Sequence, residues 1–336
     1  MTKVAVLGSG SWGTAFANVV ADAGVAEVVL WGRRAEVVDA IGRRHENPDY
    51  FPDVGLNPAL SATTDADKAL DSAEFVVIAV PSQTLRANLE AWRAAVPRDA
   101  VIVSLMKGIE LGTSRRMSEV IAEALELPAE QVAVVSGPNL AREIAERQPA
   151  TAVVACAHEP TAVRLQHICK SAYFRPYTNT DVVGAELGGA VKNVIALAVG
   201  VAVGMGFGDN AKASLITRGL AETVRLAVSL GADEHTLAGL AGMGDLVATC
   251  SSPLSRNRTF GEKLGSGMTL EEVIAETRQT AEGVKSSESI LALARANGVD
   301  MPITEAVVAM MHHDLPPAQA LLAFMSRSAK PERYGM

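Results

Sequence analysis

The chain has 336 residues, of which 49% are hydrophobic and 20% charged, and its formal net charge is −8. This length allows two domains with sizeable cores, and the acidic balance argues against nonspecific binding to nucleic acid. Cys156, Cys169 and Cys250 are odd in number and widely spaced, with no CxxC pair. They argue against a disulfide framework or a zinc site and favour a reducing cytoplasm.

No basic segment followed by an apolar stretch and a cleavage site stands at the N-terminus, so we expect no signal peptide. The most apolar stretch, residues 194–203, contains Gly200 and follows Lys192 and Asn193. It is too short to span a bilayer. We therefore expect a buried helix and no stable membrane insertion.

Short β-rich runs alternate with helix-patterned runs through the first half of the chain. The predicted strands are residues 4–7, 28–31, 75–80, 101–105 and 132–136, with two more near 152–155 and 173–177. The predicted helices are residues 13–23, 35–43, 83–95, 114–125, 140–146 and 160–170, and a proline-rich loop covers 47–58. Apolar strands alternating with helices predict a parallel sheet covered on both faces.

Beyond about residue 178 no β-rich run appears, and long stretches have helical spacing instead. The predicted helices are residues 182–203, 212–230, 235–240, 270–277, 287–297 and 302–310. We therefore predict an α/β, doubly wound domain at residues 1–180 and an all-α domain at 181–336. The polar tail from Ser326 should fray.

A glycine-rich turn, GSGSWG at residues 8–13, follows the first predicted strand and precedes a helix. Gly8 would allow the tight turn, Gly10 would let the backbone approach a pyrophosphate, and Gly13 would let the helix pack on the strand. Amides of Ser11 and Trp12 would then face the phosphates at a helix N-terminus. The alternative is a βα turn without a ligand, but its position between strand and helix favours a dinucleotide site.

The second predicted strand ends in LWGRR, residues 30–34. An NAD-specific site usually has an acidic residue there for the ribose 2′-hydroxyl, whereas Arg33 and Arg34 offer guanidinium groups to a 2′-phosphate. The pattern favours NADP(H). Because Glu36 is close by, NAD(H) stays open as the alternative cofactor. Both arginines could also be solvated residues at the start of a helix, without a ligand.

Residues at the carboxyl ends of later strands are further candidates, because ligands bind there in open α/β sheets. Lys107 follows one such strand directly and should point into the ligand crevice, unless it is an ordinary surface lysine. Gly137 and Asn139 follow the next strand. Asn139 either caps a helix or marks free amides that bind an oxygen atom.

Lys192 stands in an apolar helical segment, with Gly188 and Gly189 one turn before it on the same face. We interpret the glycines as a bare patch for a substrate, because each costs a helix about 1 kcal/mol relative to alanine. Lysine in such surroundings suits a general acid or base. The alternative is a structural pair with a buried carboxylate.

Two later segments carry polar candidates. Asp245 follows a glycine-flanked turn and would orient Lys192 or bind a substrate hydroxyl. Ser255 fits an N-cap, so that the helix start with Arg256 and Asn257 would hold a phosphate, unless it is merely a solvated cap. We expect His312 and His313 to be solvated, and no ligand spacing predicts a metal site.

Together these residues resemble the bacterial NAD(P)-dependent sn-glycerol-3-phosphate dehydrogenase family. The motifs that carry the resemblance occur in order between residue 4 and about residue 305: GSGSWGTA, LWGRR, MKGIE, SGPNLAREIA, ELGGAVKNVIAL, AGMGDLVATC, SRNRTFG and AEGVKSS. The resemblance implies a Rossmann-type domain followed by a helical domain like the C-terminal domain of 6-phosphogluconate dehydrogenase. It also implies a cytoplasmic homodimer.

The implied reaction is the reversible reduction of dihydroxyacetone phosphate to sn-glycerol 3-phosphate, which supplies the backbone of glycerophospholipids. Another hydroxy-acid or sugar-phosphate dehydrogenase of the same architecture is the alternative. A dinucleotide sensor without catalysis is a further one, although it would not need Lys192 and Asp245.

The resemblance further implies a role for each matching residue. Lys192 is the proton acceptor in oxidation and the donor in reduction, and Lys107 and Asp245 contact the substrate near the reacting carbon. The remaining implied substrate contacts are Gly137, Asn139, Ser255, Arg256 and Asn257. The implied dinucleotide contacts are Ser11, Trp12, Arg33, Lys107, Ala141, Arg256, Thr280 and Glu282. Asn139 and Thr280 replace residues that are commoner in the family, so side-chain contacts there stay open.

Overall fold

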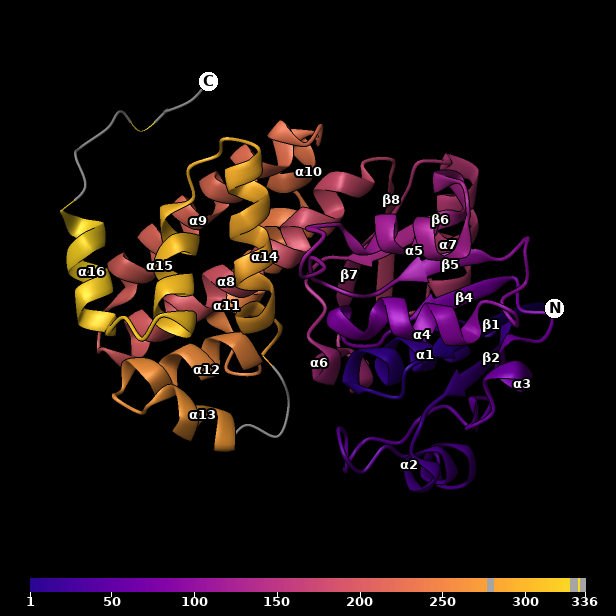
Figure 1. Ribbon diagram of the computed structural model, residues 1–336. Helices are drawn as coiled ribbons and strands as arrows, with labels where there is room; N and C mark the ends of the chain where they lie inside the picture. Colours follow the sequence, from indigo (N-terminus) through magenta and orange to yellow (C-terminus); the bar gives the residue numbers. More distant parts are fainter. Residues whose placement is uncertain (277–280, 327–331, 333–336) are drawn as a thin grey trace. The chain divides into compact units, whose positions relative to one another are not determined.

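The computed structural model describes residues 1–276, 281–326 and 332, and the chain divides into two units. The first unit comprises Met1–Lys107 and Arg115–Glu186, and the second comprises Gly108–Ser114 and Leu187–Met336 (Figure 1).

An eight-stranded sheet, in the order β3-β2-β1-β4-β5-β6-β7-β8, forms the centre of the first unit. Its strands are β1 Thr2–Leu7, β2 Ala26–Trp31, β3 Ser61–Thr63, β4 Phe75–Ile78, β5 Val101–Ser104, β6 Val132–Ser136, β7 Ala150–Cys156 and β8 Phe174–Asn179. Neighbouring strands run parallel except β6 and β7, which are antiparallel.

The prediction of a parallel sheet is thus wrong at the β6–β7 pair. The connection between these strands holds only the five-residue helix α6, Ala141–Ala145. A parallel crossover usually uses a helix to carry the chain back along the sheet, and a helix of five residues rises only about 7 Å. Strand β7 therefore starts at the end of the sheet where β6 finishes.

The register of the central strands brings several chain reversals to one edge of the sheet. Leu7 at the end of β1 pairs with Trp31 of β2 and with Ile78 of β4. Ile78 in turn pairs with Ser104 of β5. The segments that follow these four residues, including the glycine-rich turn, therefore leave the sheet at the same carboxyl edge, where open α/β sheets bind ligands.

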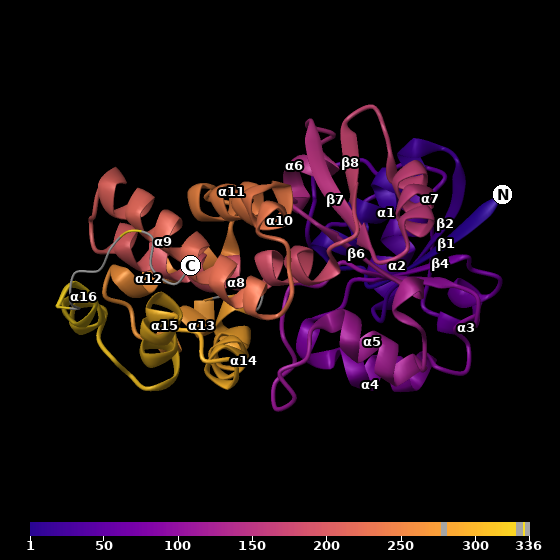
Figure 2. The same ribbon diagram turned by 90° about the horizontal axis from the view of Figure 1, so that it is seen from above.

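Helices cover both faces of this sheet (Figure 2). Their bounds are α1 Ser11–Ala23, α2 Ala35–Asp39, α3 Ala66–Leu70, α4 Leu85–Trp92, α5 Met117–Leu125, α6 Ala141–Ala145 and α7 Glu159–Cys169. Val4 and Val6 of β1 share one core with Phe16 of α1. Ala5 and Leu7 share the opposite core with α3, α4 and α5. Alternate residues of one strand thus face two cores, as a sheet buried on both sides requires.

Three local features of this unit differ from the sequence prediction. Strand β3 and helix α3 were not predicted, because three and five residues are too few to show a period. The helix expected at 35–43 is α2 followed by a π-helical turn, Ala40–Arg44. That turn ends at His45, whose φ of 55° reverses the chain into the following loop.

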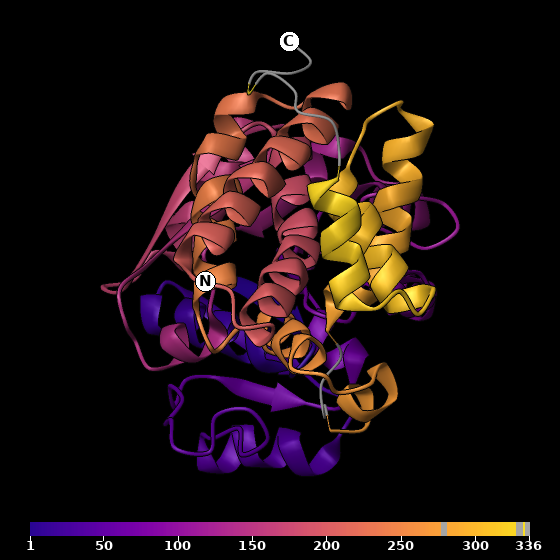
Figure 3. The ribbon, with the colours of Figure 1, turned by 90° about the vertical axis from the view of Figure 1, so that its left-hand side faces the viewer.

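From Leu187 onward, the described residues of the second unit form helices joined by turns and loops, with no strand, as predicted (Figure 3). Its helices are α8 Val182–Gly204, which starts in the first unit, α9 Asp209–Ser229, α10 Glu234–Ala238, α11 Asp245–Ser251, α12 Arg256–Gly265, α13 Leu270–Glu276, α14 Glu282–Ala296, α15 Pro302–His312 and α16 Pro317–Met325. The prediction missed α11 and α16. Helix α8 is long and apolar enough to cross a membrane, but 89% of its most apolar window is buried inside the protein. It is a core helix, as expected.

Helices α8 and α12 pack backbone to backbone at four glycines. A Cβ atom at Gly200 would lie 2.1 Å from the carbonyl oxygen of Arg258, and one at Gly204 would lie 2.1 Å from that of Glu262. On α12, Gly261 and Gly265 approach α8 equally closely. The close approach fixes the start of α12, which carries candidate site residues, beside α8.

A buried carboxylate makes the stability of the second unit depend on pH. Glu222 of α9 accepts hydrogen bonds from the amides of Ile303 (2.7 Å) and Thr304 (3.2 Å) in the first turn of α15. Burial raises the pKa of Glu222 to about 7. The folded state therefore keeps a proton that the unfolded state releases near pH 4.5.

We expect the free energy of unfolding to fall as the pH rises from about 4.5 to about 7. Glu222 alone should contribute about 1 kcal/mol or more to this fall. Urea unfolding at several pH values measures the slope. Glu222→Gln should flatten it, whereas Glu305→Gln, at an exposed site, should not. An unchanged slope in Glu222→Gln would contradict the assignment.

Candidate active-site residues of each unit

The three glycines of the turn after β1 have different surroundings. Gly8 has a φ of +130°, and a Cβ there would lie 2.5 Å from the carbonyl oxygen of Ala79. A Cβ at Gly13 would lie 2.0 Å from the carbonyl oxygen of Gly8. At Gly10, by contrast, a Cβ would meet no heavy atom of the described chain within 4 Å. Protein packing explains the first and third glycines, and the space beside Gly10 is open to a bound group.

Helix α1 begins at this turn without a capping side chain. Gly10 is the N-cap residue, and the first backbone bond of the helix runs from the Thr14 amide to the Gly10 carbonyl oxygen (2.9 Å). The amides of Ser11 and Trp12 come before this first hydrogen bond, so the helix backbone does not use them. They lie at the positive end of the helix dipole. Trp12 Nε1 is buried and has no partner among the described residues. This donor set fits the pyrophosphate of a dinucleotide.

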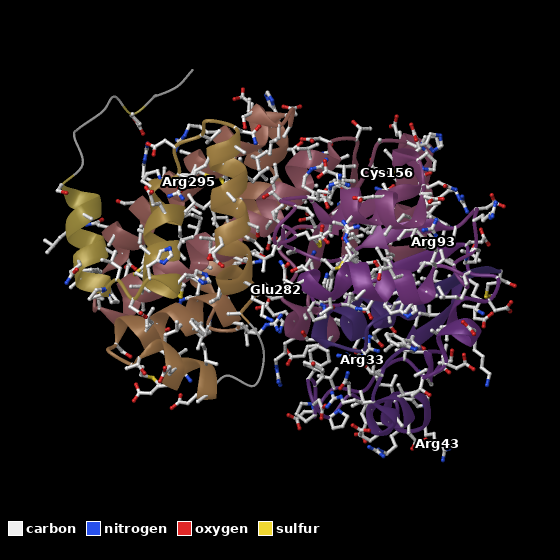
Figure 4. The ribbon with its side chains drawn as sticks, viewed as in Figure 1. Arg33, Arg43, Arg93, Cys156, Glu282 and Arg295 are labelled. Carbon is white, nitrogen blue, oxygen red and sulfur yellow. The ribbon has the colours of Figure 1, made fainter. Side chains whose placement is uncertain are left out.

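The end of β2 lies next to the glycine turn, since the Gly8 amide donates to the carbonyl oxygen of Trp31 (3.0 Å). Arg33, labelled in Figure 4, is exposed and forms no ion pair within the described ranges. Arg34 is also exposed, but its guanidinium pairs with the carboxylate of Asp49. The two arginines therefore differ in how available they are to a 2′-phosphate.

Lys107 and Gly137 come together after the neighbouring strands β5 and β6. The Lys107 ammonium donates to the carbonyl oxygen of Gly137 (3.0 Å), and Gly137 has a φ of +117° that suits glycine.

Asn139 does not cap helix α6, so that part of the prediction is wrong. The helix begins at Ala141, and Leu140 is its N-cap residue. Asn139 lies one position too early to reach the first amides. Both polar atoms of its side chain are buried without a partner in the described part of the chain. Such an amide costs stability unless a further group satisfies it.

Lys192, Asp245 and Thr249 form a buried cluster in the second unit. Lys192 Nζ lies 2.8 Å from Asp245 Oδ1 and donates a hydrogen bond to Thr249 Oγ1 at 2.5 Å. The Thr249 hydroxyl in turn donates to Asp245 Oδ1 (3.3 Å). Lys192 is 7% exposed and Asp245 1% exposed. The cluster holds an ammonium group at a fixed position.

Sequence reasoning missed Thr249. Its only signal was a spacing of four residues from Asp245, which places both on one face of α11. The neighbouring Cys250 is also buried, and burial raises the pKa of its thiol to about 12. The thiol stays protonated at neutral pH and offers no thiolate nucleophile.

The interpretation of Gly188 as the floor of a substrate patch is wrong. A Cβ at Gly188 would lie 2.4 Å from the carbonyl oxygen of Ala241. Ala241 belongs to a π-helical turn, Leu240–Gly244, that leads directly into Asp245. Gly188 therefore lets α8 pack against the turn that positions Asp245.

The start of α12 is capped as predicted, since the Ser255 side chain accepts a hydrogen bond from the Arg258 amide (3.3 Å). Arg256 is exposed. Asn257 is buried, and its amide donates to Asn193 Oδ1 and accepts from the Gly283 amide, each at 3.0 Å. Asn257 therefore connects α12 with α8 and with the first turn of α14.

Glu282 is the first residue of α14 and is labelled in Figure 4. Thr280 lies outside the described residues. The first unit thus holds the glycine turn, both arginines and the Lys107–Gly137 contact. The second holds the Lys192 cluster and the start of α12.

The expectation that His312 is solvated is wrong. Its Nε2 lies 3.1 Å from Ser287 Oγ and 3.0 Å from the carbonyl oxygen of Val284. Although this pair resembles part of a hydrolase triad, Ser287 is fully buried and cannot meet a substrate. Within the described residues, no three His, Cys, Asp or Glu side chains are grouped to hold a metal ion.

Two family models cover most of the chain. The one for the N-terminus of NAD-dependent glycerol-3-phosphate dehydrogenase matches residues 3–162, and the one for the C-terminus of the same enzyme matches residues 181–322. This chain belongs to the NAD-dependent glycerol-3-phosphate dehydrogenase family. It is therefore an NAD(P)-dependent oxidoreductase with a Rossmann-type domain.

Individual members of the family match this chain over nearly its full length. A glycerol-3-phosphate dehydrogenase [NAD(P)+] from Thermobifida fusca is 81% identical over 336 residues, which cover both chains completely. One from Streptomyces griseus is 66% identical and covers 98% of each chain. The crystal structure of glycerol-3-phosphate dehydrogenase from Coxiella burnetii has a TM-score of 0.91 and 37% identity, covering 97% of this chain and 99% of that one.

A more distant structure shares the fold alone. The ketopantoate reductase from Ralstonia eutropha has a TM-score of 0.59 and 18% identity, covering 95% of this chain and 100% of that one. Family membership therefore favours a glycerol-3-phosphate dehydrogenase over another dehydrogenase of similar architecture.

Proposed function

We propose that this chain reduces dihydroxyacetone phosphate reversibly to sn-glycerol 3-phosphate, with NADP(H) preferred and NAD(H) as the alternative. The observation that carries the proposal is the buried cluster of Lys192, Asp245 and Thr249, in a chain of this family. We further propose a cytoplasmic homodimer that supplies the glycerophospholipid backbone. Residues 1–180 are proposed as the dinucleotide-binding domain and 181–336 as the substrate and catalytic domain.

The glycine turn is the proposed dinucleotide site. Amides of Ser11 and Trp12 would hold the pyrophosphate beside the open space at Gly10. Further proposed contacts, which rest on the family motifs, are Arg33, Lys107, Ala141, Arg256, Thr280 and Glu282. When bound, the nicotinamide supplies a hydride for a carbonyl carbon.

Lys192 is the proposed proton donor in reduction and the proton acceptor in oxidation. Its Nζ would give a proton to the carbonyl oxygen of the substrate as negative charge develops there. The Asp245 carboxylate and the Thr249 hydroxyl hold Nζ in one place, so little reorganisation is needed during the reaction. Lys107 and Asp245 are proposed substrate contacts near the reacting carbon. Gly137 and Asn139 are proposed substrate contacts as well.

Arg256, with Ser255 and Asn257 at the start of α12, is the proposed phosphate anchor. The Ser255 hydroxyl and both ends of the Asn257 amide already have partners in the protein. Most of the charge for a phosphate must then come from Arg256 and the helix start. The phosphate is remote from the reacting carbon, so its binding energy positions the carbonyl.

Arg256→Ala should raise the KM for dihydroxyacetone phosphate about tenfold to a hundredfold, the usual loss for a charged hydrogen bond. The KM for NADPH should change less. Steady-state kinetics measure both values. Lys263→Ala, which removes a half-buried cation of the same helix, is the matched control and should leave both within about twofold. An unchanged KM in Arg256→Ala would remove it from the phosphate site.

Arg33→Ala should raise the KM for NADPH about tenfold and leave the KM for NADH nearly unchanged, because only NADPH carries the 2′-phosphate. Arg34→Ala is the matched control and should have a smaller effect, since Asp49 already pairs with Arg34. A wild-type protein with a lower KM for NADH than for NADPH would refute the proposed preference.

A substrate panel tests the proposed function against the alternatives. NADPH oxidation is followed by absorbance with dihydroxyacetone phosphate, with 2-oxo acids such as ketopantoate, and with sugar-acid phosphates. We expect the highest kcat/KM with dihydroxyacetone phosphate. A higher value with another substrate would favour another dehydrogenase of this architecture, and no oxidation with any of them would favour a sensor.

A further inference from the structure

Asn47 joins the two ends of the glycine turn from a loop that the proposed function does not use. Its side chain is fully buried. Nδ2 donates one hydrogen bond to the carbonyl oxygen of Ser9 (3.1 Å) and one to Thr14 Oγ1 (2.9 Å). Ser9 lies between Gly8 and Gly10, and Thr14 lies in the first turn of α1. A single amide therefore spans the turn that would face a pyrophosphate.

The orientation of the Asn47 amide follows from its partners. A backbone carbonyl oxygen only accepts hydrogen bonds, so Nδ2, not Oδ1, must face Ser9. Both hydrogens of Nδ2 are thereby used. Oδ1 is buried and has no partner among the residues that the structure describes. An unpaired buried acceptor costs stability, so fold stability alone does not explain an asparagine at this position.

Backbone hydrogen bonds and core packing of the loop hold Asn47 in place. The carbonyl oxygen of Asn47 accepts hydrogen bonds from the amides of Tyr50 (3.2 Å) and Phe51 (2.8 Å). Phe51 is 2% exposed and belongs to the core of the first unit. On the other side, His45 directs the chain into this loop through its left-handed backbone conformation, φ 55°. The backbone of Asn47 is thus anchored to the core of the first unit.

Planarity of the peptide group connects this anchor to the cofactor site. The C=O of Ser9 and the N–H of Gly10 belong to one trans peptide and point in opposite directions. Because Asn47 holds the C=O, it also fixes the direction of the Gly10 N–H, which points away from Asn47. Gly10 is the residue beside which the described chain leaves open space.

We infer that Asn47 is a positioning residue for the pyrophosphate of the dinucleotide. It sets the backbone of the glycine turn so that the amides at the start of α1 are oriented before binding, which lowers the cost of ordering them. This inference rests on the proposed function of the Gly8–Gly13 turn. It adds a residue that itself makes no proposed contact with the cofactor.

The test measures NADPH binding by calorimetry in the wild type, Asn47→Ala and Asn57→Ala. Asn57 is the matched control. It stands in the same loop, and its Nδ2 donates to Asp22 Oδ1 (2.7 Å) near the other end of α1. We expect Asn47→Ala to raise the Kd for NADPH on the order of tenfold and Asn57→Ala to leave it within about twofold. At saturating NADPH, kcat and the KM for dihydroxyacetone phosphate should stay unchanged in both variants.

A second pair of variants keeps the test decisive if Asn47→Ala does not fold. Thr14→Val removes one acceptor of the Asn47 amide at nearly constant volume, and Thr14→Ser keeps the hydroxyl. Thr14→Val should weaken NADPH binding several-fold, and Thr14→Ser should bind as the wild type does. Equal Kd values for the wild type and either Asn47→Ala or Thr14→Val would overturn the inference. Failure of the wild type itself to bind NADPH would instead overturn the proposed function.

Discussion

Lys192→Ala lowers kcat for dihydroxyacetone phosphate reduction by about two to four orders of magnitude, the usual contribution of a positioned general acid. Its Nζ is held by Asp245 and Thr249 in a buried cluster, and no water-exposed lysine could reproduce that position. The Kd for NADPH should stay within about threefold, because Lys192 is not among the proposed dinucleotide contacts. Stopped-flow absorbance and calorimetry measure the two quantities.

Two controls separate the chemical role of Lys192 from a structural one. Lys212→Ala removes a half-buried lysine of α9 that pairs with Asp209, three residues before it, and kcat should not change. Thr249→Val removes one partner of Nζ, so kcat should fall, but by less than in Lys192→Ala. Near-normal turnover of a folded Lys192→Ala protein would show that another group supplies the proton.

Gly261→Val has the largest expected effect on stability. A Cβ at Gly261 would lie 2.2 Å from the carbonyl oxygen of Leu197 and 2.9 Å from the amide nitrogen of Val201. Backbone atoms cannot move aside as a flexible side chain does, so α8 and α12 must separate. We expect a loss of about 3 kcal/mol or more in the free energy of unfolding, at the upper end for overpacked cores.

Urea unfolding followed by circular dichroism measures the loss in Gly261→Val. Gly208→Ala is the matched control in the same unit, because a Cβ there meets no heavy atom of the described chain within 4 Å. Its cost should stay below about 1 kcal/mol. Equal stability of Gly261→Val and the wild type would contradict the backbone-to-backbone packing of these helices.

The sequence alone predicted features whose cause is local. Gly8 and Gly13 were assigned to the turn because their signal is a strand, a spacing and a helix within about twenty residues, and the structure shows the close contacts that require them. The helical second unit followed from periodicity. Ser255 was identified as a cap because N-capping depends on neighbouring residues only.

Features that depend on distant partners could not be predicted. Gly188 appeared to serve a ligand, but a glycine looks the same in sequence whether it faces a substrate or a backbone such as Ala241. The antiparallel direction of β7 leaves no trace in hydrophobic periodicity. The role of Asn47 could be inferred only from its hydrogen bonds to Ser9 and Thr14 in the folded structure. Thr249 had a weak local signal but gained its meaning from Lys192.

In the candidate site, too, local features could be predicted from the sequence and contacts with distant residues could not. The motifs indicated which residue types matter, and the family comparisons support the chemistry. Only the structure distinguishes Arg34, which pairs with Asp49, from Arg33, and shows that the Asn257 amide already has protein partners. Such differences decide which variant should change cofactor preference and which should change substrate binding.

Product analysis of the wild-type reaction tests the proposed function most directly. The purified protein is mixed with dihydroxyacetone phosphate and NADPH, and both the loss of NADPH and the phosphorylated product are quantified. We predict one sn-glycerol 3-phosphate formed for each NADPH oxidised, with a single stereochemistry at C2. Stable NADPH in the presence of dihydroxyacetone phosphate, or a product other than sn-glycerol 3-phosphate, would contradict it.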